Sequence, residues 1–318
     1  MSMAPGAGGG RRGWVIAGVA VVVAGVLAFH RAVPNWPGRA GSLLESFLPW
    51  VGVLVVVLLI GALVRRSAVA LVALLLPVAV WVHLFGGLLL PAAAGDGPGL
   101  VVVQHNVSDE NRDPAGTARA LIEAGADLVA LEELVAPQLA VYEKVLAPDY
   151  PHHVVRGTVG LWSKYPISGG RLVDIKPPDI EEGWSRGVRA VVHSPYGEVA
   201  AYVAHLPSVR VGAGGLASER RDESAALLGR AIAADGVETV ILLGDLNGAV
   251  EDRGLSPLTS RLNVAERGFA LSFPASFPLA RIDQVMARSA TVGHIRTLPA
   301  TGSDHLPVAA RVVLPDRR

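Results

Sequence analysis

The apolar residues of this 318-residue chain are concentrated in its first third. Three long apolar runs stand out there, Trp14–Phe29, Phe47–Val64 and Ala68–Leu90. A helix needs about 17–25 apolar residues to cross the hydrocarbon core of a bilayer. The third run is comfortably long and the second is adequate, whereas the first is short unless Gly13 and His30 are counted. We therefore predict three transmembrane helices.

A cleaved signal peptide is the competing interpretation of the first run. Arg11 and Arg12 precede its apolar stretch, as they would in a secretory or twin-arginine export signal. No small-residue cleavage site follows, because the run ends in Phe29-His30-Arg31, and two further apolar runs come after it. We therefore expect the first run to be retained as a membrane span.

The arginines of the short loops predict the orientation of these spans, because cytoplasmic loops are enriched in Lys and Arg. The arginine pairs 11–12 and 65–66 lie on the same side of the membrane if all three helices cross it. The first loop also carries Arg31 and Arg39, so the bias is modest. If the paired arginines face the cytoplasm, the protein is a multi-pass protein of the plasma membrane. The chain after the third span then lies outside the cytoplasm.

The pattern changes after the small-residue segment Pro91–Gly99, which divides the chain into a membrane domain (1–97) and a second domain (98–318). Short β-rich apolar runs now dominate, and two segments, 113–124 and 216–234, have helical periodicity. The predicted strands are Leu100–Val107, Asp127–Leu131, Thr158–Trp162, Gly187–His193, Glu198–His205, Thr239–Leu243, Arg281–Ala287 and Val308–Val313. Strands outnumber helices, which predicts an α/β domain of two packed sheets with a few covering helices.

Charge and composition exclude several functions of the second domain. Residues 1–97 carry six arginines against Glu45 and Asp96, a net charge of +4, so residues 98–318 carry a net charge of −4. A net-negative domain is a poor general binder of polyanions, which argues against avid non-specific DNA binding. The chain has no cysteine, which excludes disulfides, thiolate zinc sites and a thiol nucleophile.

Polar residues break the apolar pattern at the ends of four predicted strands. They are Asn106, the pair Glu132-Glu133, Asp245 with Asn247, and the pair Asp304-His305. Residues two apart on a strand face the same way, so we expect Asp245 and Asn247 to point into one site. Oxygen ligands without thiolates suit Mg²⁺. Each signal alone is also typical of an ordinary turn or cap, and only the ordered set favours a catalytic site.

In their order, these segments resemble the endonuclease/exonuclease/phosphatase superfamily, which includes DNase I, AP endonucleases, sphingomyelinases and inositol-polyphosphate 5-phosphatases. The matching segments are Asn106, Ala130–Glu133, Leu161–Ile167, Ala204–Leu206, Gly244–Asn247, Arg281–Asp283 and Ser303–His305. Two positions depart from the family pattern: Glu132 replaces the usual Gln, which adds a carboxylate near the metal, and Ala204 replaces Thr or Ser. The stretch Asn111–Pro114 resembles membrane-anchored bacterial members, some of them associated with resistance to glycopeptide antibiotics.

The resemblance implies a DNase I-like four-layer α/β sandwich with the site at one end. It also implies that Glu133 and Asn106 hold Mg²⁺, with Mn²⁺ as an alternative, and that Asp304 adds a metal ligand. In the family pattern, Asp245 and Asn247 orient the attacking water, His305 pairs with Asp283 and donates to the phosphate, and His205 lies on the other side of it. Arg189, on a predicted strand, is a candidate phosphate contact or an ordinary surface arginine.

Three functions remain open at this point. The first is a membrane-anchored hydrolase that acts outside the cytoplasm on phospholipid or lipid-linked cell-envelope phosphates. The second is a tethered nuclease, and the third is a non-catalytic membrane scaffold, against which the full set of site residues argues. The loop Pro177–Trp184 carries three acidic residues and one aromatic residue, and it would repel a DNA backbone if it touched the substrate. We therefore favour the first function, with the bilayer and a lipid-linked phosphoester as binding partners and nucleic acid as the less favoured substrate.

Overall fold

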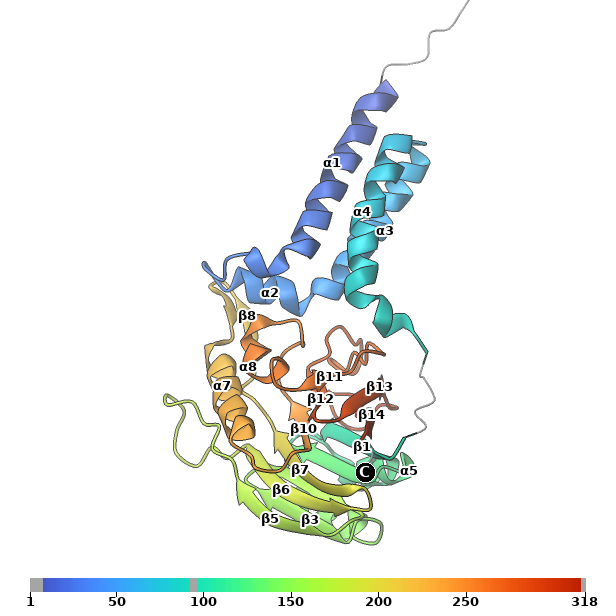
Figure 1. Cartoon of the computed structure of the whole chain (residues 1–318). Coiled ribbons are helices and arrows are strands. Elements are labelled where there is room, and N and C mark those ends of the chain that lie inside the picture. Colours follow the sequence, from blue (N-terminus) through green and yellow to red (C-terminus); the bar gives the residue numbers. More distant parts are fainter. Residues whose placement is uncertain (1–7, 92–96, 316–318) are drawn as a thin grey trace, which may run out of the picture.

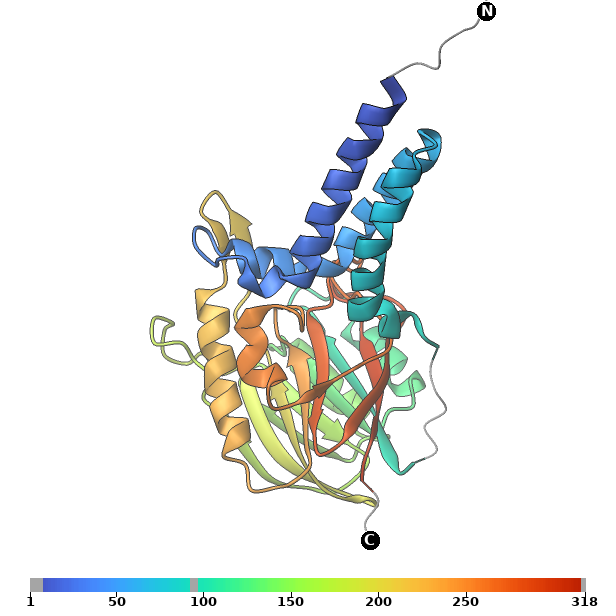
Figure 2. The ribbon, with the colours of Figure 1, turned by 45° about the horizontal axis from the view of Figure 1, so that its top comes forward.

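The computed structural model describes residues 8–91 and 97–315. It has two parts, which we call the helical part (8–91) and the α/β body (97–315). The helices of the helical part project from one end of the body (Figure 1). The described C-terminal end of the chain lies at the opposite end of the body (Figure 2). The domain boundary predicted at residues 97–98 falls just before the first strand, β1.

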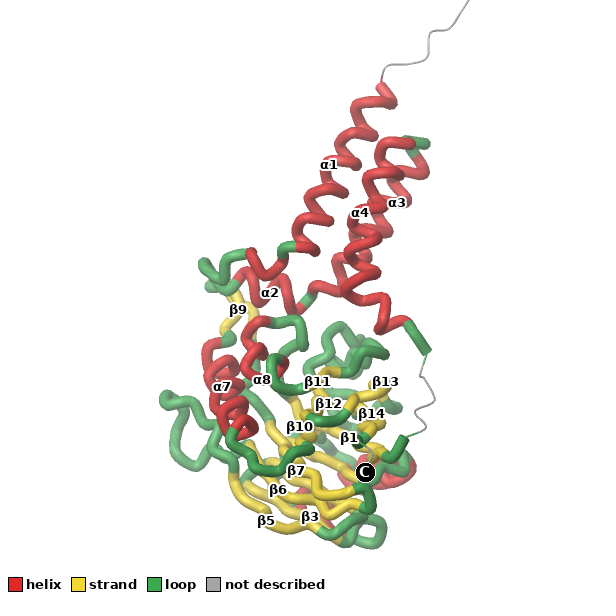
Figure 3. Tube along the Cα trace, in the orientation of Figure 1, coloured by secondary structure: helices red, strands yellow, loops and turns green. Residues whose placement is uncertain are grey.

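Two six-stranded mixed sheets form the body (Figure 3). The first sheet has the order β13-β14-β1-β2-β4-β3, and the second has the order β11-β12-β10-β7-β6-β5. The strands of the first sheet are β1 (Gly99–Asn106), β2 (Leu128–Glu132), β3 (His152–Arg156), β4 (Val159–Ser163), β13 (Thr291–Thr297) and β14 (Val308–Val313). Those of the second are β5 (Ile167–Leu172), β6 (Gly187–Ser194), β7 (Gly197–Ala204), β10 (Val240–Asp245), β11 (Asn263–Val264) and β12 (Asp283–Arg288).

Buried side chains join the sheets and helices into four layers. One apolar cluster lies between the sheets, with Val102 from the first sheet and Leu243 from the second among its members. A second cluster lies between the first sheet and the helices α5 (Pro114–Glu123) and α6 (Gln138–Leu146). A third packs the second sheet against α7 (Glu219–Ala233) and α8 (Ser256–Thr259). This is the DNase I-like sandwich, and the two-sheet prediction is confirmed.

All eight predicted strands are present, with ends that differ from the prediction by at most two residues. The helix predicted after Asp113 begins there because the Asp113 carboxylate accepts a hydrogen bond from the Gly116 N–H at 2.8 Å. The sequence analysis missed α6 and the edge strands β3, β5 and β13, together with the short hairpin β8 (Arg210–Gly212) and β9 (Gly215–Ala217). Edge strands are partly exposed, so their sequences lack a continuous apolar run.

Strand direction brings the candidate residues to one end of the sandwich. Strands β1 and β2 are parallel, as are β7 and β10. Parallel neighbours end at the same edge of a sheet, so Asn106 and Glu132 are paired across the first sheet. Asp245 and Asp283 are paired across antiparallel β10 and β12, because β12 begins where β10 ends.

The helical part consists of α1 (Gly8–Ala28), α2 (Ala40–Ser46), α3 (Val51–Val64) and α4 (Ala68–Phe85), with a 3₁₀ turn at Leu48–Trp50 and others after α1 and α4. By length and composition, one helix, Ala68–Leu89, can cross a membrane. The segments Ala40–Ser46 and Leu48–Val64 would form a second span only as a pair bent by 67°, and Gly13–Ala28 is apolar but shorter. Three membrane spans therefore stay a prediction.

Polar contacts attach the helical part to the body. The buried Glu45 carboxylate accepts hydrogen bonds from the Arg253 backbone N–H and from its guanidinium, at 2.8–2.9 Å. Arg39 donates to Glu219 at 2.8 Å and to Asp222 at 2.5 Å, both near the start of α7. These bonds fix the loop between α1 and α3 against the body.

Candidate active site

Asp245, Asp283 and His305 form the centre of the site. Their ligand atoms all lie within 4.8 Å of one another, and all three side chains are buried. Asp245 is the last residue of β10 and Asp283 the first of β12, while His305 precedes β14. The adjacent ends of two strands and one loop therefore place two carboxylates and an imidazole in one small volume.

His305 and Asp283 form a dyad. His305 Nδ1 lies 2.9 Å from Asp283 Oδ2, and this oxygen also accepts a hydrogen bond from the Ser272 hydroxyl at 2.5 Å. The ring of Phe273 lies against the imidazole, with the ring centroids 4.8 Å apart. Burial alone would lower the pKa of His305, but the charges of Asp283 and Asp245 raise it to about 10. The dyad therefore holds His305 as a cation with Nε2 free of Asp283.

Asp245 lies between the two histidines of the site. His305 Nε2 is 3.8 Å from Asp245 Oδ2, and His205 Nε2 is 3.6 Å from it. The Asn106 amide donates to the same oxygen at 3.1 Å. Burial raises the pKa of Asp245 to about 7; His305 opposes this rise, and Asp283 adds to it. Asp245 can therefore exchange a proton near neutral pH, as a general base requires.

A turn after β10 holds Asn247. The strand ends at Asp245, and Asn247 has a left-handed backbone with φ of 48°. Its N–H donates to Asp245 Oδ1 at 2.9 Å, and its side-chain amide donates to the Leu206 carbonyl at 2.9 Å. Asn247 does lie beside Asp245, but the strand alternation that we invoked does not apply to a residue beyond the strand.

Glu133 stands at the mouth of the site. It follows β2 with a left-handed φ of 61°, so its side chain leaves the direction of the strand. Its Oε1 accepts a hydrogen bond from the Asn106 amide at 3.1 Å, and its Oε2 accepts one from the Asp109 N–H at 3.2 Å. The side chain keeps 28% exposure. Glu133 thus offers carboxylate oxygens to an ion that enters from solvent.

Glu132 points instead into the buried floor of the site. Its Oε2 accepts a hydrogen bond at 2.8 Å from Gln104, whose amide also donates to Asp283 at 3.0 Å. Its Oε1 has no hydrogen-bond partner among the described residues. Burial, then the charges of Asp283 and Asp245, raise the pKa of Glu132 well above its usual range. The neutral carboxyl has the shape and charge of the glutamine that the family pattern has there, so Glu132 is not simply an added charge.

His205 and Arg186 lie on the side of the site opposite the His305–Asp283 dyad, and we call them the opposite wall. His205 is buried after β7, and its Nε2 lies 3.9 Å from Glu133 Oε1. The Arg186 guanidinium lies 3.2 Å from His205 Nδ1. Burial lowers the pKa of His205 well below its usual range, and the charge of Arg186 lowers it further. The sequence analysis missed Arg186; its only signal was its position just before Gly187, at the site end of β6.

Arg189 does not join the site, which corrects our phosphate-contact hypothesis. It lies in the middle of β6, and its guanidinium makes two hydrogen bonds of 2.9 Å to Asp235, beyond the end of α7. Asp235 also accepts a bond from the Tyr202 hydroxyl at 2.6 Å. Asp304 is exposed, and in the described part of the chain only its backbone carbonyl makes a hydrogen bond, to the Ala275 N–H. Its charge helps to raise the pKa of His305.

The donor set fits a hard divalent cation. Four carboxyl groups converge on the site, with Glu132 held neutral and with His305 and Arg186 as the cations among them; they are Glu132, Glu133, Asp245 and Asp283. Glu132 Oε1, buried without a partner, marks an unbalanced polar site. Carboxylate and amide oxygens suit Mg²⁺ or Mn²⁺ rather than a thiophilic metal. Among these carboxyl groups, Glu133 is open to solvent, and the buried Asn106 amide bonds it to Asp245.

A large cleft adjoins the site. It has a volume of about 970 Å³ and is lined by residues of the loop 179–184, by Arg186, and by residues 207–220. Asp179, Glu181 and Glu182 all line it, as do Arg210 and Arg220. Arg220 is itself paired with Asp179 at 2.8 Å. The cleft is therefore of mixed charge and offers no continuous basic track.

The fold and this arrangement define a class of protein, and the sequence confirms it. The chain belongs to the Endonuclease/Exonuclease/phosphatase family, whose sequence model matches residues 103–305. It is accordingly a metal-dependent phosphoester hydrolase of that family. No curated protein gives a significant match.

Solved structures share the fold at low sequence identity. Sphingomyelinase C from Streptomyces griseocarneus is 19% identical with a TM-score of 0.54, over 67% of this chain and 99% of that one. An endonuclease/exonuclease/phosphatase from Beutenbergia cavernae is 23% identical with a TM-score of 0.55, over 68% and 72%. A beta toxin variant from Staphylococcus aureus, solved with bound magnesium ions, is 14% identical with a TM-score of 0.54, over 69% and 100%.

Proposed function

We propose that this protein is a membrane-anchored, Mg²⁺-dependent phosphoester hydrolase that acts on phospholipid or lipid-linked phosphates at the bilayer surface. One observation carries the choice of substrate: the chain segments that follow Asn247 and precede Asp283 of the site also bind the helical part, through Arg253 and the Leu279 carbonyl. A substrate held in the bilayer would meet the catalytic residues there, whereas a site at the far end would be remote from lipid.

The loops that leave the site make this contact. The turn that holds Asn247 runs on to Arg253, which binds Glu45 of the helical part. The loop before Asp283 contributes the Leu279 carbonyl, which accepts a hydrogen bond from the Trp50 indole N–H at 2.7 Å. The N–H of Gly268 donates to the Leu88 carbonyl at 3.0 Å. Site loops and membrane-side segments therefore share one interface.

Glu133 and Asn106 would hold the ion, because they combine an open position with oxygen donors. A bound Mg²⁺ would offset the charge that develops on the phosphoryl oxygens. Asp304, which we predicted as a further ligand, is exposed beside His305, on whose pKa its charge acts, and remains a candidate ligand. Mn²⁺ has similar ligand preferences and is the alternative ion.

Side chains of the site can carry out the proton transfers of the hydrolysis. Asp245, with a pKa raised to about 7, would accept a proton from the attacking water, and Asn247 fixes the carboxylate through its N–H. His305, held as a cation by Asp283, would donate from Nε2 to a phosphoryl oxygen. The neutral His205 and the cationic Arg186 would face the phosphate from the opposite wall.

A tethered nuclease is the second candidate, and the cleft beside the site disfavours it. Nucleic-acid grooves follow the backbone with positive charge. Here three acidic residues of the loop 179–184 line the cleft, and one of its arginines is already paired. The non-catalytic scaffold is disfavoured because Asp245, Asp283 and His305 converge in one buried cluster, which a scaffold does not need.

The arrangement of the helices supports a catalytic body outside the cytoplasm. Helix α1 starts far from the body, and Gly13 lies against Ser67 in the turn between α3 and α4 (Figure 1). The arginine pairs 11–12 and 65–66 therefore lie at the end of the helical part away from the body. If these pairs face the cytoplasm, the body lies on the other side. A reporter that is active only in the cytoplasm, fused after Arg318, should be inactive.

Hydrolysis by the detergent-solubilised full-length protein tests the proposal. It should cleave a lipid phosphate or lipid pyrophosphate with Mg²⁺ and lose activity in excess EDTA. Asp245→Ala and His305→Ala should each lower kcat/KM by at least about 10²-fold, while Asp149→Ala, at an exposed carboxylate, should not. Cleavage of DNA with no cleavage of lipids would reverse the choice of substrate, and full activity in EDTA would refute the mechanism.

A further inference from the structure

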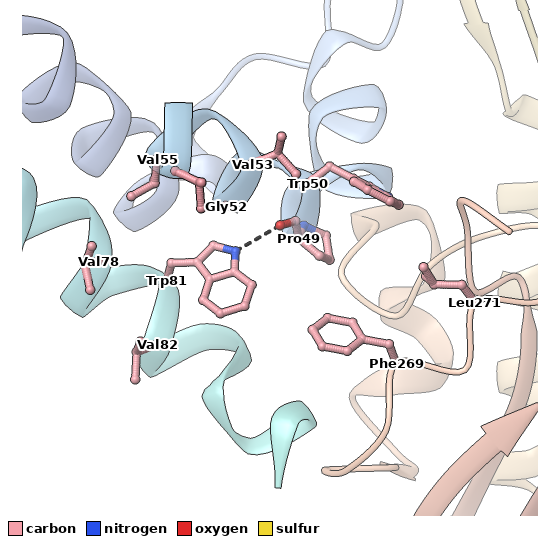
Figure 4. A pocket seen from close by; sticks show the side chains of 11 residues that line it. Pro49, Trp50, Gly52, Val53, Val55, Val78, Trp81, Val82, Phe269 and Leu271 are labelled. Carbon is pink, nitrogen blue, oxygen red and sulfur yellow. Dashed lines mark hydrogen bonds between the residues drawn. The ribbon is translucent and has the colours of Figure 1, made fainter. Parts of the chain in front are cut away.

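An apolar cleft lies where the helical part meets the body (Figure 4). It has a volume of about 430 Å³, within the range of small-molecule sites. Helices α3 and α4 and the 3₁₀ turn before α3 supply most of its walls, and the loop before β12 supplies Phe269 and Leu271. The helical part and the catalytic body therefore form this cleft together.

The chemistry of the walls selects an apolar occupant. The two indole N–H groups in the wall are already used: Trp81 donates to the Pro49 carbonyl at 2.9 Å (Figure 4). Trp50 donates to the Leu279 carbonyl at 2.7 Å. The other lining side chains are aliphatic or aromatic. A polar ligand would lose its hydrogen bonds to water here and gain none in return.

The surroundings of the cleft indicate that this occupant is an acyl chain. Val53 and Val56 of α3 and Val82 of α4 line the cleft, and each keeps more than half of its surface exposed. These residues belong to two of the apolar helices proposed to lie in the bilayer. The cleft is thus continuous with the surface that lipid chains would cover, and lipid chains are the apolar molecules at hand.

Polar residues border the apolar cleft on the side of the body. A smaller cavity shares four of the cleft's lining residues but adds polar ones, Ser46, Glu251 and Arg281. Arg281 lies two residues before Asp283. In the loop that lines the cleft, Leu271 is followed by Ser272, which contacts Asp283, and by Phe273, which contacts His305. The apolar cleft is therefore bordered by polar residues on the side where the chain continues to Ser272 and Asp283, which suits a lipid whose tail lies in the cleft and whose headgroup lies outside it.

We propose that the apolar cleft binds one acyl chain of the lipid phosphoester substrate, so that the enzyme recognises the tail as well as the phosphate. This inference rests on the proposed function for the identity of the substrate, although lipid binding in the cleft does not require catalysis. The cleft faces the loop that carries Ser272, so a bound chain would place its headgroup on the catalytic side of the interface.

Filling the cleft tests the proposal. Val78→Phe narrows it from α4 and Leu271→Phe narrows it from the body. Val72→Phe is the matched control, because Val72 is an exposed valine on the same helix outside the cleft. Full-length protein is placed in phosphatidylcholine vesicles that contain a phosphatidylcholine with a photoactivatable group in its acyl chain, and crosslinked residues are mapped by mass spectrometry. Kinetics are measured on a long-chain lipid phosphoester and on a soluble aryl phosphodiester.

Crosslinks should appear at Phe269 and Leu271 in the unaltered protein and in Val72→Phe, and should fall at least about 5-fold in Val78→Phe. Both cleft-filling variants should lose about 10-fold or more in kcat/KM on the lipid substrate and keep their rate on the soluble one. Equal crosslinking of the body loop in Val78→Phe and Val72→Phe, or absence of crosslinks there, overturns the acyl-chain site. If no phosphoester is hydrolysed while the crosslinks follow this pattern, the proposed function fails and the lipid site stands.

Discussion

Arg189 and Arg186 have different roles: Arg189 stabilises the fold, whereas Arg186 acts at the site. Replacing each of them with glutamine distinguishes the two roles. In Arg189→Gln, the buried Asp235 loses both guanidinium hydrogen bonds and keeps donors only from Tyr202 and the Val237 N–H. Removing one partner of a buried ion pair costs about 3–5 kcal/mol. Because Arg189 retains 12% side-chain exposure, water can replace part of the loss, and we expect about 2–3 kcal/mol of destabilisation.

The two variants should differ both in Tm and in kcat/KM. About 2–3 kcal/mol corresponds to a fall in Tm of about 4–12 °C for a body of this size, while kcat/KM of the folded enzyme stays unchanged. Arg186→Gln should instead leave Tm within about 2 °C and lower kcat/KM by about 10²-fold, because it removes a positive charge at the phosphate wall. The pair Arg189→Gln with Asp235→Asn serves as the control, since the double variant should lose less than the sum of the single ones.

The opposite pattern would refute this assignment. A loss of activity in Arg189→Gln without a fall in Tm would restore Arg189 as a phosphate contact. Unchanged kcat/KM in Arg186→Gln would remove Arg186 from the site.

Three further predictions concern groups at the site and at the interface. Glu132→Gln should keep activity and stabilise the protein by more than about 1 kcal/mol at pH 8. The reason is that burial and Asp283 raise the pKa of Glu132 in the folded protein, so its ionisation destabilises the fold once the pH rises above the pKa of Glu132 in the unfolded chain. Equal gains in Tm at pH 4 and at pH 8 would contradict this. Asp283→Asn should lower kcat by about 10²–10⁴-fold. It should also shift the alkaline limb of the pH–rate profile to lower pH, because His305 loses a charge that helps to raise its pKa to about 10. An alkaline limb at an unchanged pH would argue against the dyad. Glu45→Gln should weaken the docking of the helical part by about 1.5–3 kcal/mol through its hydrogen bonds to Arg253, and unchanged proteolysis between the two parts would show that this contact is dispensable.

The sequence predicted most of the catalytic centre because chemistry and strand pattern coincide there. Asn106 and Asp245 end apolar runs, so their positions follow from the strand boundaries, whereas Asp283 entered through the family resemblance. His305 and Asp283 are 22 residues apart, and no spacing argument joins them; the family resemblance supplied that pair, and the structure places them 2.9 Å apart. The edge strands were missed because their exposed faces lack an apolar period.

The errors arose where a side chain's direction decides its role. Arg186 and Arg189 are three residues apart, and sequence gave no ground to choose between them, because β6 begins at Gly187 and only the pairing with β7 reveals which arginine reaches His205. Glu132 and Glu133 are adjacent carboxylates, yet the left-handed backbone at Glu133 turns one toward solvent and leaves the other in the floor. Such differences depend on tertiary packing, which local patterns do not encode.

The same limit applies to the charges that predict orientation. Counted from the sequence, Arg39 weakens the bias of the paired arginines, because it adds a positive charge on the opposite side of the membrane. In the folded protein its guanidinium is bonded to Glu219 and Asp222 of the body, so its charge is balanced within the molecule. Glu45 similarly balances Arg253. The positive-inside rule counts Lys and Arg and is little affected by Asp and Glu, so orientation depends on the four arginines of pairs 11–12 and 65–66 against Arg31 and Arg39, a count that favours a catalytic body outside the cytoplasm.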